Sequence, residues 1–168
     1  MEMLMERSVP VDGVMHGTFD DKADLVAGPK TVSDVWNIIP FENYVVTAQL
    51  SPEEIKTAME EVFASHEKRN LLGFDVKTEG RGDDCKIASI TLANREPLDR
   101  SKKYVIAFNS FDARSGGHHF MKLRGFLARQ EANCILHPVQ TRDALIGYFH
   151  RHKIVHRMAA MKALAVAA

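Results

Sequence analysis

The sequence is most constrained by one stretch, in which a strand-like run leads into a loop with two adjacent glycines. The run spans residues 104–108, and the loop continues through Gly116 and Gly117 to residue 120. Adjacent glycines let a backbone turn through positive φ or approach another group closely. Phe111 lies between the strand and the glycines, where its flat apolar ring could stack on a planar ligand. On residue types alone, a strand-to-helix turn with Phe111 in the core is the favoured interpretation, because a lone Gly-Gly pair is weak evidence for a ligand site.

The first clear helix signal follows a Gly-Pro pair at residues 28–29. Thr31 is a typical N-cap, and Asp34, three residues later, completes a capping-box pair that suits the positive end of the helix dipole. Apolar residues at helical spacing predict one buried face, made of Val32, Val35, Trp36 and Ile39. Pro40 ends this helix, and we expect Trp36 in the core rather than against a ligand.

Strand and helix patterns follow one another along the rest of the chain. Strands are expected over residues 44–50, 71–76, 86–92 and 104–108, with a short one within 9–15. Helices are expected from the Ser51 cap to near His66 and after a cap at Thr141. Residues 121–140 show no clean period. The mixture predicts an α+β (mixed α/β) fold in one domain, residues 1–168, with a single mixed sheet of about five strands and helices packed on it.

Composition limits the partners that this chain can have. Lys plus Arg and Asp plus Glu are 22 each, so we expect no nucleic-acid partner, because phosphate binding needs a basic surface. No apolar run has the length of a membrane span, and we expect no membrane partner. Residues 1–7 are too acidic for a signal peptide, which favours a cytosolic protein or a piece of a longer chain. Cys85 and Cys134 exclude a disulfide framework and leave room for one bridge.

The sequence contains no motif that supplies a catalytic centre. Gly-x-Ser-x-Gly and Walker motifs are missing, as is the Asp and His spacing of a two-metal phosphatase site. We therefore expect no catalytic residue and no metal ligand in this chain. His118 and His119 are adjacent, so in an extended chain they would face opposite ways. His152 and His156 could share a helical face as zinc ligands do, and a zinc site built from these four histidines is the weakest alternative.

An ordered set of short motifs resembles the C-terminal domain of the 5'-nucleotidase family, which includes bacterial UDP-sugar hydrolases and related exported metallophosphatases. The motifs are IPFEN at 39–43 before a strand, Leu50 before a helix, PLD at 97–99 before Tyr104, and NSF at 109–111 followed by SGG at 115–117. They keep the family's order and spacing over residues 14–156, ahead of an Ala-rich tail at 157–168. The resemblance implies the same α+β fold.

The resemblance also implies that two domains have separate roles. In the family, an N-terminal domain binds two metal ions and hydrolyses the substrate, while the C-terminal domain holds the base between two aromatic rings. By resemblance, Phe111 is the second of these rings and Asn70 reads the edge of the base. The remaining substrate-binding residues expected here are Asn109, Gly116, Gly117, His118 in place of a ribose-binding Asp, and Lys68 in place of the first ring.

Several residues depart from the family pattern. Besides the changes at positions 68 and 118, Phe19 stands where the family has an arginine, and Arg114 is a one-residue insertion in the glycine loop. These departures remove half of the aromatic sandwich and one cation. They argue against a nucleotide and leave open a differently shaped phosphorylated small molecule or no ligand at all.

Two hypotheses about function follow. The first is the substrate-recognition domain of a 5'-nucleotidase-like metallophosphohydrolase, which binds a nucleotide or a related phosphorylated small molecule. Its partner would be an N-terminal metallophosphatase domain that carries the divalent metals, so this chain alone would be catalytically incomplete and need no cofactor. The resemblance places such proteins mostly in the periplasm or at the cell surface. The alternative is a degenerate, non-catalytic domain of the same fold that serves binding or packing.

Overall fold

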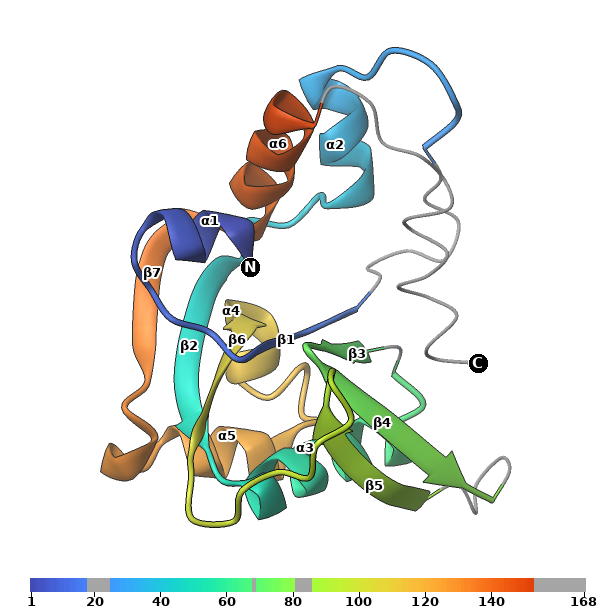
Figure 1. Ribbon diagram of the computed structural model, residues 1–168. Helices are drawn as coiled ribbons and strands as arrows, with labels where there is room; N and C mark the ends of the chain where they lie inside the picture. Colours follow the sequence, from blue (N-terminus) through green and yellow to red (C-terminus); the bar gives the residue numbers. More distant parts are fainter. Residues whose placement is uncertain (18–24, 68, 81–85, 153–168) are drawn as a thin grey trace.

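A five-stranded mixed sheet forms the centre of the protein (Figure 1). The computed structural model describes residues 1–17, 25–67, 69–80 and 86–152. The strand order is β3-β1-β6-β2-β7; β1 runs parallel to β6, and the other neighbours are antiparallel. The strands are β1 (Gly13–Gly17), β2 (Tyr44–Leu50), β3 (Arg69–Leu72), β6 (Tyr104–Asn109) and β7 (Ile135–Gln140). The predicted α+β fold with a mixed sheet of about five strands is therefore confirmed.

Helices pack on this sheet and above one end of it. They are α1 (Glu2–Glu6), α2 (Val32–Ile38), α3 (Pro52–Ala64), α4 (Ser110–Ala113), α5 (Met121–Leu127), the 3-10 turn η2 (Gln130–Ala132) and α6 (Thr141–Arg151). Helices α3 and α5 lie together at the bottom of the view in Figure 1, whereas α2 and α6 form a pair at the top. The main core lies between the sheet and α3 and α5, and its most buried large side chains include Tyr104, Phe120 and Leu123.

A separate two-stranded sheet completes the fold. It consists of β4 (Phe74–Glu79) and β5 (Lys86–Leu92), paired antiparallel. The segment 71–76, expected as one strand, is divided at Gly73, where the chain leaves the large sheet and enters the small one. Gly73 has a φ of +93°, and an added Cβ there would lie 2.3 Å from the carbonyl oxygen of Asp12. The division therefore depends on a backbone turn that only glycine makes without strain.

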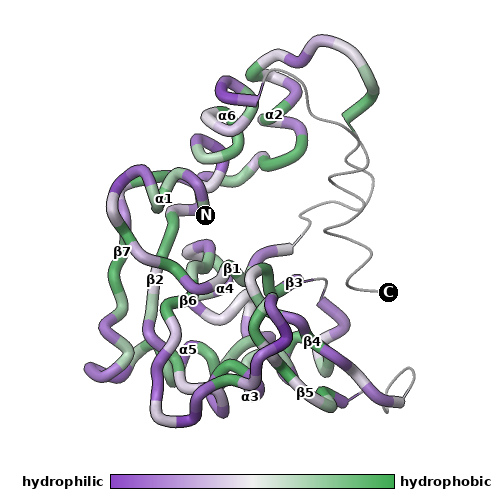
Figure 2. The backbone as a smooth tube through the Cα atoms, in the orientation of Figure 1, coloured by the Kyte–Doolittle hydropathy of each residue, from purple (hydrophilic) through white to green (hydrophobic). Residues whose placement is uncertain are grey.

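Local signals identified the ends of two helices correctly. Thr31 and Asp34 form a full capping box at the start of α2, and Ser51 and Glu54 form another at the start of α3. Each box satisfies backbone N–H groups that the first turn of a helix leaves without an intrahelical partner. The tube in Figure 2 shows α3 alternating between hydrophobic and hydrophilic colours, as a helix with one buried face should.

Three expectations in the α2–α6 pair were wrong. Val32, expected on the buried face of α2, is 49 % exposed. Trp36 is not in the core, because its side chain is 44 % exposed and one ring face is covered by the guanidinium of Arg142, 3.2 Å from the ring centroid. Thr141 is not the N-cap of α6, which is Gln140. Thr141 is instead the first helical residue, and its hydroxyl donates to the carbonyl oxygen of Asn43 at 3.3 Å.

Residues 121–140 form three short elements, which explains why no single period was visible there. Helix α5 is followed by η2 and then by edge strand β7, whose burial does not alternate. Cys134 precedes β7 as an exposed free thiol, whereas Cys85, His156, Phe19 and the tail 157–168 lie outside the described residues. None of the helices in the described part of the chain combines the length and apolar character that a bilayer span requires.

We predict opposite effects of the same substitution at two glycines. Gly73→Ala should destabilise the protein by at least about 2 kcal/mol, because it adds a Cβ both at positive φ and against a backbone oxygen. Gly125→Ala, in α5 with open space around the added Cβ, should stabilise it by about 0.5–1 kcal/mol. Urea unfolding of both variants checks this, and equal free energies of unfolding for the two would contradict the account.

Candidate functional site

Phe111 lies on the surface of α4, the one-turn helix that follows β6. Asn109 caps this helix, since its Oδ1 accepts from the backbone N–H of Asp112 at 2.9 Å. Asp112 is wholly buried, whereas Phe111, directly before it, is 46 % exposed. A four-residue helix with one buried carboxylate can rotate little, so the ring of Phe111 is presented to solvent. The alternative that placed Phe111 in the core is not what the structure has.

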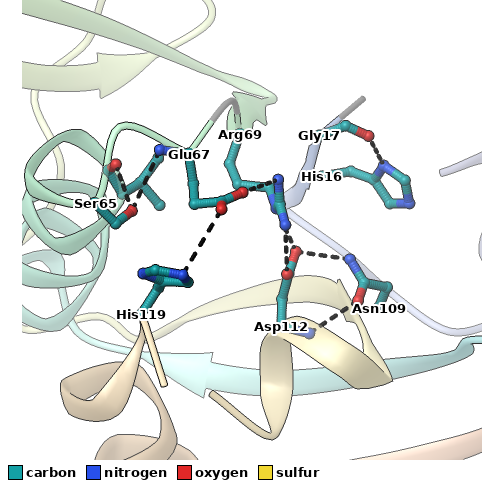
Figure 3. Close-up of polar contacts among 9 residues, drawn as sticks. His16, Gly17, Ser65, Glu67, Arg69, Asn109, Asp112 and His119 are labelled. Carbon is teal, nitrogen blue, oxygen red and sulfur yellow. Dashed lines mark hydrogen bonds and ion pairs between the residues drawn. The ribbon is translucent and has the colours of Figure 1, made fainter. Parts of the chain in front are cut away.

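A buried ion pair holds α4 to strand β3 (Figure 3). Nε of Arg69 donates to Oδ2 of Asp112 at 2.8 Å, and Nη2 donates to Oδ1 at 3.1 Å, which is a bidentate pair. Nδ2 of Asn109 donates to the same Oδ2 at 2.7 Å. The Asp112 carboxylate thus receives three hydrogen bonds, which offsets the cost of burying its charge.

The glycine loop after α4 is defined by its backbone. Ser115, Gly116, Gly117 and His118 all have positive φ, at 115°, 52°, 70° and 76°. A side chain at Gly116 would collide with the ring of Phe120, whereas at Gly117 it would meet the Phe111 ring at ordinary contact distance, 3.5 Å. The backbone N–H of His118 donates to Oγ of Ser115 at 3.2 Å. The loop therefore passes directly beside the exposed ring.

His16 and Asn70 lie side by side on the neighbouring strands β1 and β3, where they are register partners. Burial lowers the pKa of the His16 imidazole below its ordinary value of 6.5, and the Arg69 guanidinium lowers it further. The hydrogen bond of its Nδ1 with the Gly17 carbonyl oxygen, at 2.8 Å, and the Asp112 carboxylate act in the opposite direction. The balance keeps His16 neutral near pH 7.

A second carboxylate joins the buried pair to the rim of the site. Nη1 of Arg69 donates to Oε2 of Glu67 at 3.2 Å, and Nε2 of His119 lies 3.9 Å from Oε1 of the same side chain. His119 is half-exposed and Glu67 is about one-third exposed, so a charged His119 gains only a weak, screened interaction here. Figure 3 shows this row of contacts running from Asp112 through Arg69 and Glu67 to His119.

The structure brings together most of the residues expected to bind substrate. Phe111, Gly116, Gly117 and His118 share one segment, whereas Asn70 lies on the edge strand β3, beside His16 of β1. Asn109 is fully buried and serves as the cap of α4. Lys68 lies outside the described residues. Arg69 and Asp112 were not anticipated, because they are 43 residues apart and no local pattern pairs them.

The described part of the chain offers no cluster of metal-binding side chains. Within residues 1–17, 25–67, 69–80 and 86–152, no three His, Cys, Asp or Glu side chains gather in a way that could hold a metal ion.

The lowered pKa of His16 predicts a loss of stability in mild acid. The unfolded chain takes up the His16 proton near pH 6.5, above the pKa of the folded state, so unfolding becomes easier as the pH falls below 6.5. His16→Gln should therefore lose less unfolding free energy than the wild type between pH 7.5 and 5.5, measured by urea denaturation. Some dependence should remain, because burial also lowers the pKa of His137. Parallel curves for His16→Gln and wild type would refute the assignment.

Comparison with known proteins agrees with this architecture. The NAD nucleotidase NadN of Haemophilus influenzae superposes with a TM-score of 0.71 at 18% sequence identity, over 84% of this chain and 27% of that one. A 5'-nucleotidase precursor of Thermus thermophilus superposes with a TM-score of 0.72 at 21% identity, over 92% of this chain and 31% of that one. The chain thus spans less than a third of either protein. No curated protein matches it in sequence.

Comparison of the sequence with family models points to the same group of proteins. The model described as 5'-nucleotidase, C-terminal domain, matches residues 9–124, which include the strands β1 to β6 and the glycine loop. This match covers well over half of the chain and agrees with the resemblance in the short motifs. The chain belongs to the 5'-nucleotidase C-terminal domain family.

Proposed function

We propose that this chain is the substrate-recognition domain of a 5'-nucleotidase-like metallophosphohydrolase. In this proposal Phe111 stacks on the base of a nucleotide or on a planar group of a related phosphorylated small molecule. The observation that carries it is the half-exposed ring of Phe111, set on a helix whose next residue is completely buried. An aromatic ring held in a fixed position offers a flat apolar face on which a planar group can stack.

The geometry around the ring suits stacking. The ring loses little entropy on binding, since α4 is held by the Asn109 cap and by the Arg69–Asp112 pair. Stacking of a base on an aromatic ring contributes about 1–3 kcal/mol per base in proteins that bind single-stranded nucleic acids. The positive-φ loop at residues 115–118 runs past the same ring. Its shape is held by the backbone N–H groups of Ser115, Gly116 and His118, which donate to oxygen atoms of Asp112, Phe111 and Ser115. Asn70, on β3, supplies the polar group for the edge of the base.

Hydrolysis is assigned to a second domain. The chain spans 27% and 31% of the two solved nucleotidases, and its family corresponds to the C-terminal part of such enzymes. We propose that an N-terminal metallophosphatase domain binds the divalent metals and breaks the phosphate ester, and that the whole protein is exported. The Thermus thermophilus neighbour is described as a precursor, which accords with export.

One observation favours the alternative of a degenerate domain that only binds or packs. The Arg69 guanidinium donates to two carboxylates, those of Asp112 and Glu67, beside the helix α4 that carries Phe111. Those contacts turn its charge toward the protein rather than toward a phosphate. A titration with ligand separates the two functions.

We predict that AMP binds at the glycine loop and that Phe111 is required. Titration of the chain with AMP, followed by amide NMR shifts, should give saturable changes at Phe111, Gly116 and Gly117. Phe111→Ala should weaken binding about tenfold or more, which corresponds to the stacking contribution of a single ring. Leu136→Ala provides the control, because Leu136 is a 60 % exposed apolar residue on edge strand β7.

Either outcome of the AMP titration distinguishes substrate recognition from a degenerate domain. Saturable shifts that require about tenfold more AMP or are lost in Phe111→Ala, and that keep their wild-type midpoint in Leu136→Ala, support substrate recognition. Unchanged shifts up to millimolar AMP in the wild type would mean that this site does not recognise nucleotides, as in a degenerate domain.

A further inference from the structure

We infer that Arg69 is a positioning residue for the Phe111 platform, by which we mean helix α4 with the exposed ring of Phe111. Its guanidinium fork sets the orientation of α4 relative to strand β3. The consequence for ligand binding rests on the proposed function, whereas the positioning itself does not. Arg69 need not touch the ligand to act in this way. Its effect passes through Asp112, the residue that directly follows Phe111.

The sheet topology explains why such a link is needed. Strand β3 is at the edge of the large sheet and pairs with β1, whereas α4 follows β6, on the other side of β1. Helix α4 packs chiefly on β2, β6 and α5. Asn70 on β3 and Phe111 on α4 are therefore carried by elements that are not neighbours. The Arg69–Asp112 pair joins these two elements directly, across 43 residues of sequence.

The chemistry of the pair fixes an angle as well as a distance. Two parallel hydrogen bonds, of 2.8 and 3.1 Å, bind the planar guanidinium to both oxygens of the carboxylate. A planar fork that engages both oxygens defines the orientation of the carboxylate plane, which a lysine ammonium cannot do. Since Asp112 is in a single-turn helix, fixing its side chain also fixes the direction of the residue before it.

Burial makes the link strong. The side chains of Arg69 and Asp112 are 7% and 0% exposed, so water does not compete for their hydrogen bonds. A charge left without its partner at such a position is strongly unfavourable, and the surrounding structure must move to relieve it. The elements that can move are the short helix α4 and the loop that follows it.

Arg69 is also placed behind the site rather than in it. Side chains alternate along a strand, so Arg69 lies on the same face of β3 as Leu71, which belongs to the main core. Its guanidinium lies 5.6 Å from the ring centroid of buried Phe120. Asn70 faces the opposite way, beside His16. One residue thus anchors β3 to α4, while its neighbour lies on the other face of the sheet.

The first test needs no ligand. Arg69→Lys keeps the positive charge that Asp112 requires, so the protein should fold, but it removes the fork. We expect backbone amides of residues 110–117 to exchange hydrogen about tenfold faster than in wild type, while those of α3 and β2 keep their rates. Arg129→Lys is the matched control, because Arg129 makes an exposed pair with Glu54. Wild-type exchange rates at residues 110–117 in Arg69→Lys would overturn the inference.

The second test asks whether Arg69 acts on binding through Phe111. Arg69→Lys should weaken AMP binding about tenfold, measured by the same amide shifts. In a Phe111→Ala background the same change should cost less than about twofold, because the ring that Arg69 positions is no longer there. Additive losses would overturn the inference, as would wild-type affinity in Arg69→Lys.

The two tests separate this inference from the proposed function. Faster exchange at residues 110–117 in Arg69→Lys, combined with a wild-type protein that does not bind AMP, supports positioning by Arg69 and refutes nucleotide recognition. Normal AMP binding by wild type, combined with unchanged exchange in Arg69→Lys, supports the proposed function and refutes positioning.

Discussion

The interaction on which the site depends is the buried pair between a guanidinium on β3 and a carboxylate on α4. A carboxylate with no exposure to water is tolerated only when its lone pairs are satisfied, and here Arg69 and Asn109 satisfy them. Because both donors come from fixed elements, meeting this electrostatic requirement also determines where α4 lies. The same requirement places the residue before Asp112 on the outside of the helix, which is why an apolar ring is found in water.

This arrangement relates the fold to the recognition role that we propose for the chain. The large sheet brings the end of β6 and the edge strand β3 to the same region, although residues 69 and 112 are far apart in sequence. A recognition domain needs such a rigid platform more than it needs reactive side chains, since binding is limited by the freedom that the ligand and the platform lose. In the proposed function, residues 69–70 and 108–120 supply that platform.

The features of the fold that could be predicted from the sequence are those produced by interactions between residues close together in the chain. The boxes at Thr31 and Ser51 act within three residues, and the apolar patterning of β2, β5 and β6 is equally local, so helix starts and strands were found. Trp36 was placed wrongly because its partner, Arg142, comes from a helix more than a hundred residues later. Arg69 and Asp112 were missed for the same reason.

The resemblance in short motifs filled part of this gap. It identified the glycine loop and the family, because such motifs record the tertiary structure of relatives. It could not identify a pair that stands behind the platform, since neither Arg69 nor Asp112 belongs to those motifs. The division of the 71–76 segment was missed because Gly73 lies within an otherwise apolar run, and only the position of Asp12 explains it.

The succession of four positive φ angles from Ser115 to His118 has a consequence for how this surface can change. The path of the loop is determined by main-chain torsions and by the contact of Gly116 with Phe120, not by the groups that residues 118 and 119 carry. Those two side chains are exposed. Substitution at these two positions can therefore alter the charge and hydrogen bonding of the rim while the ring of Phe111 stays in place. Proteins that share this fold can acquire different ligand preferences in this way, by changes at its outermost positions.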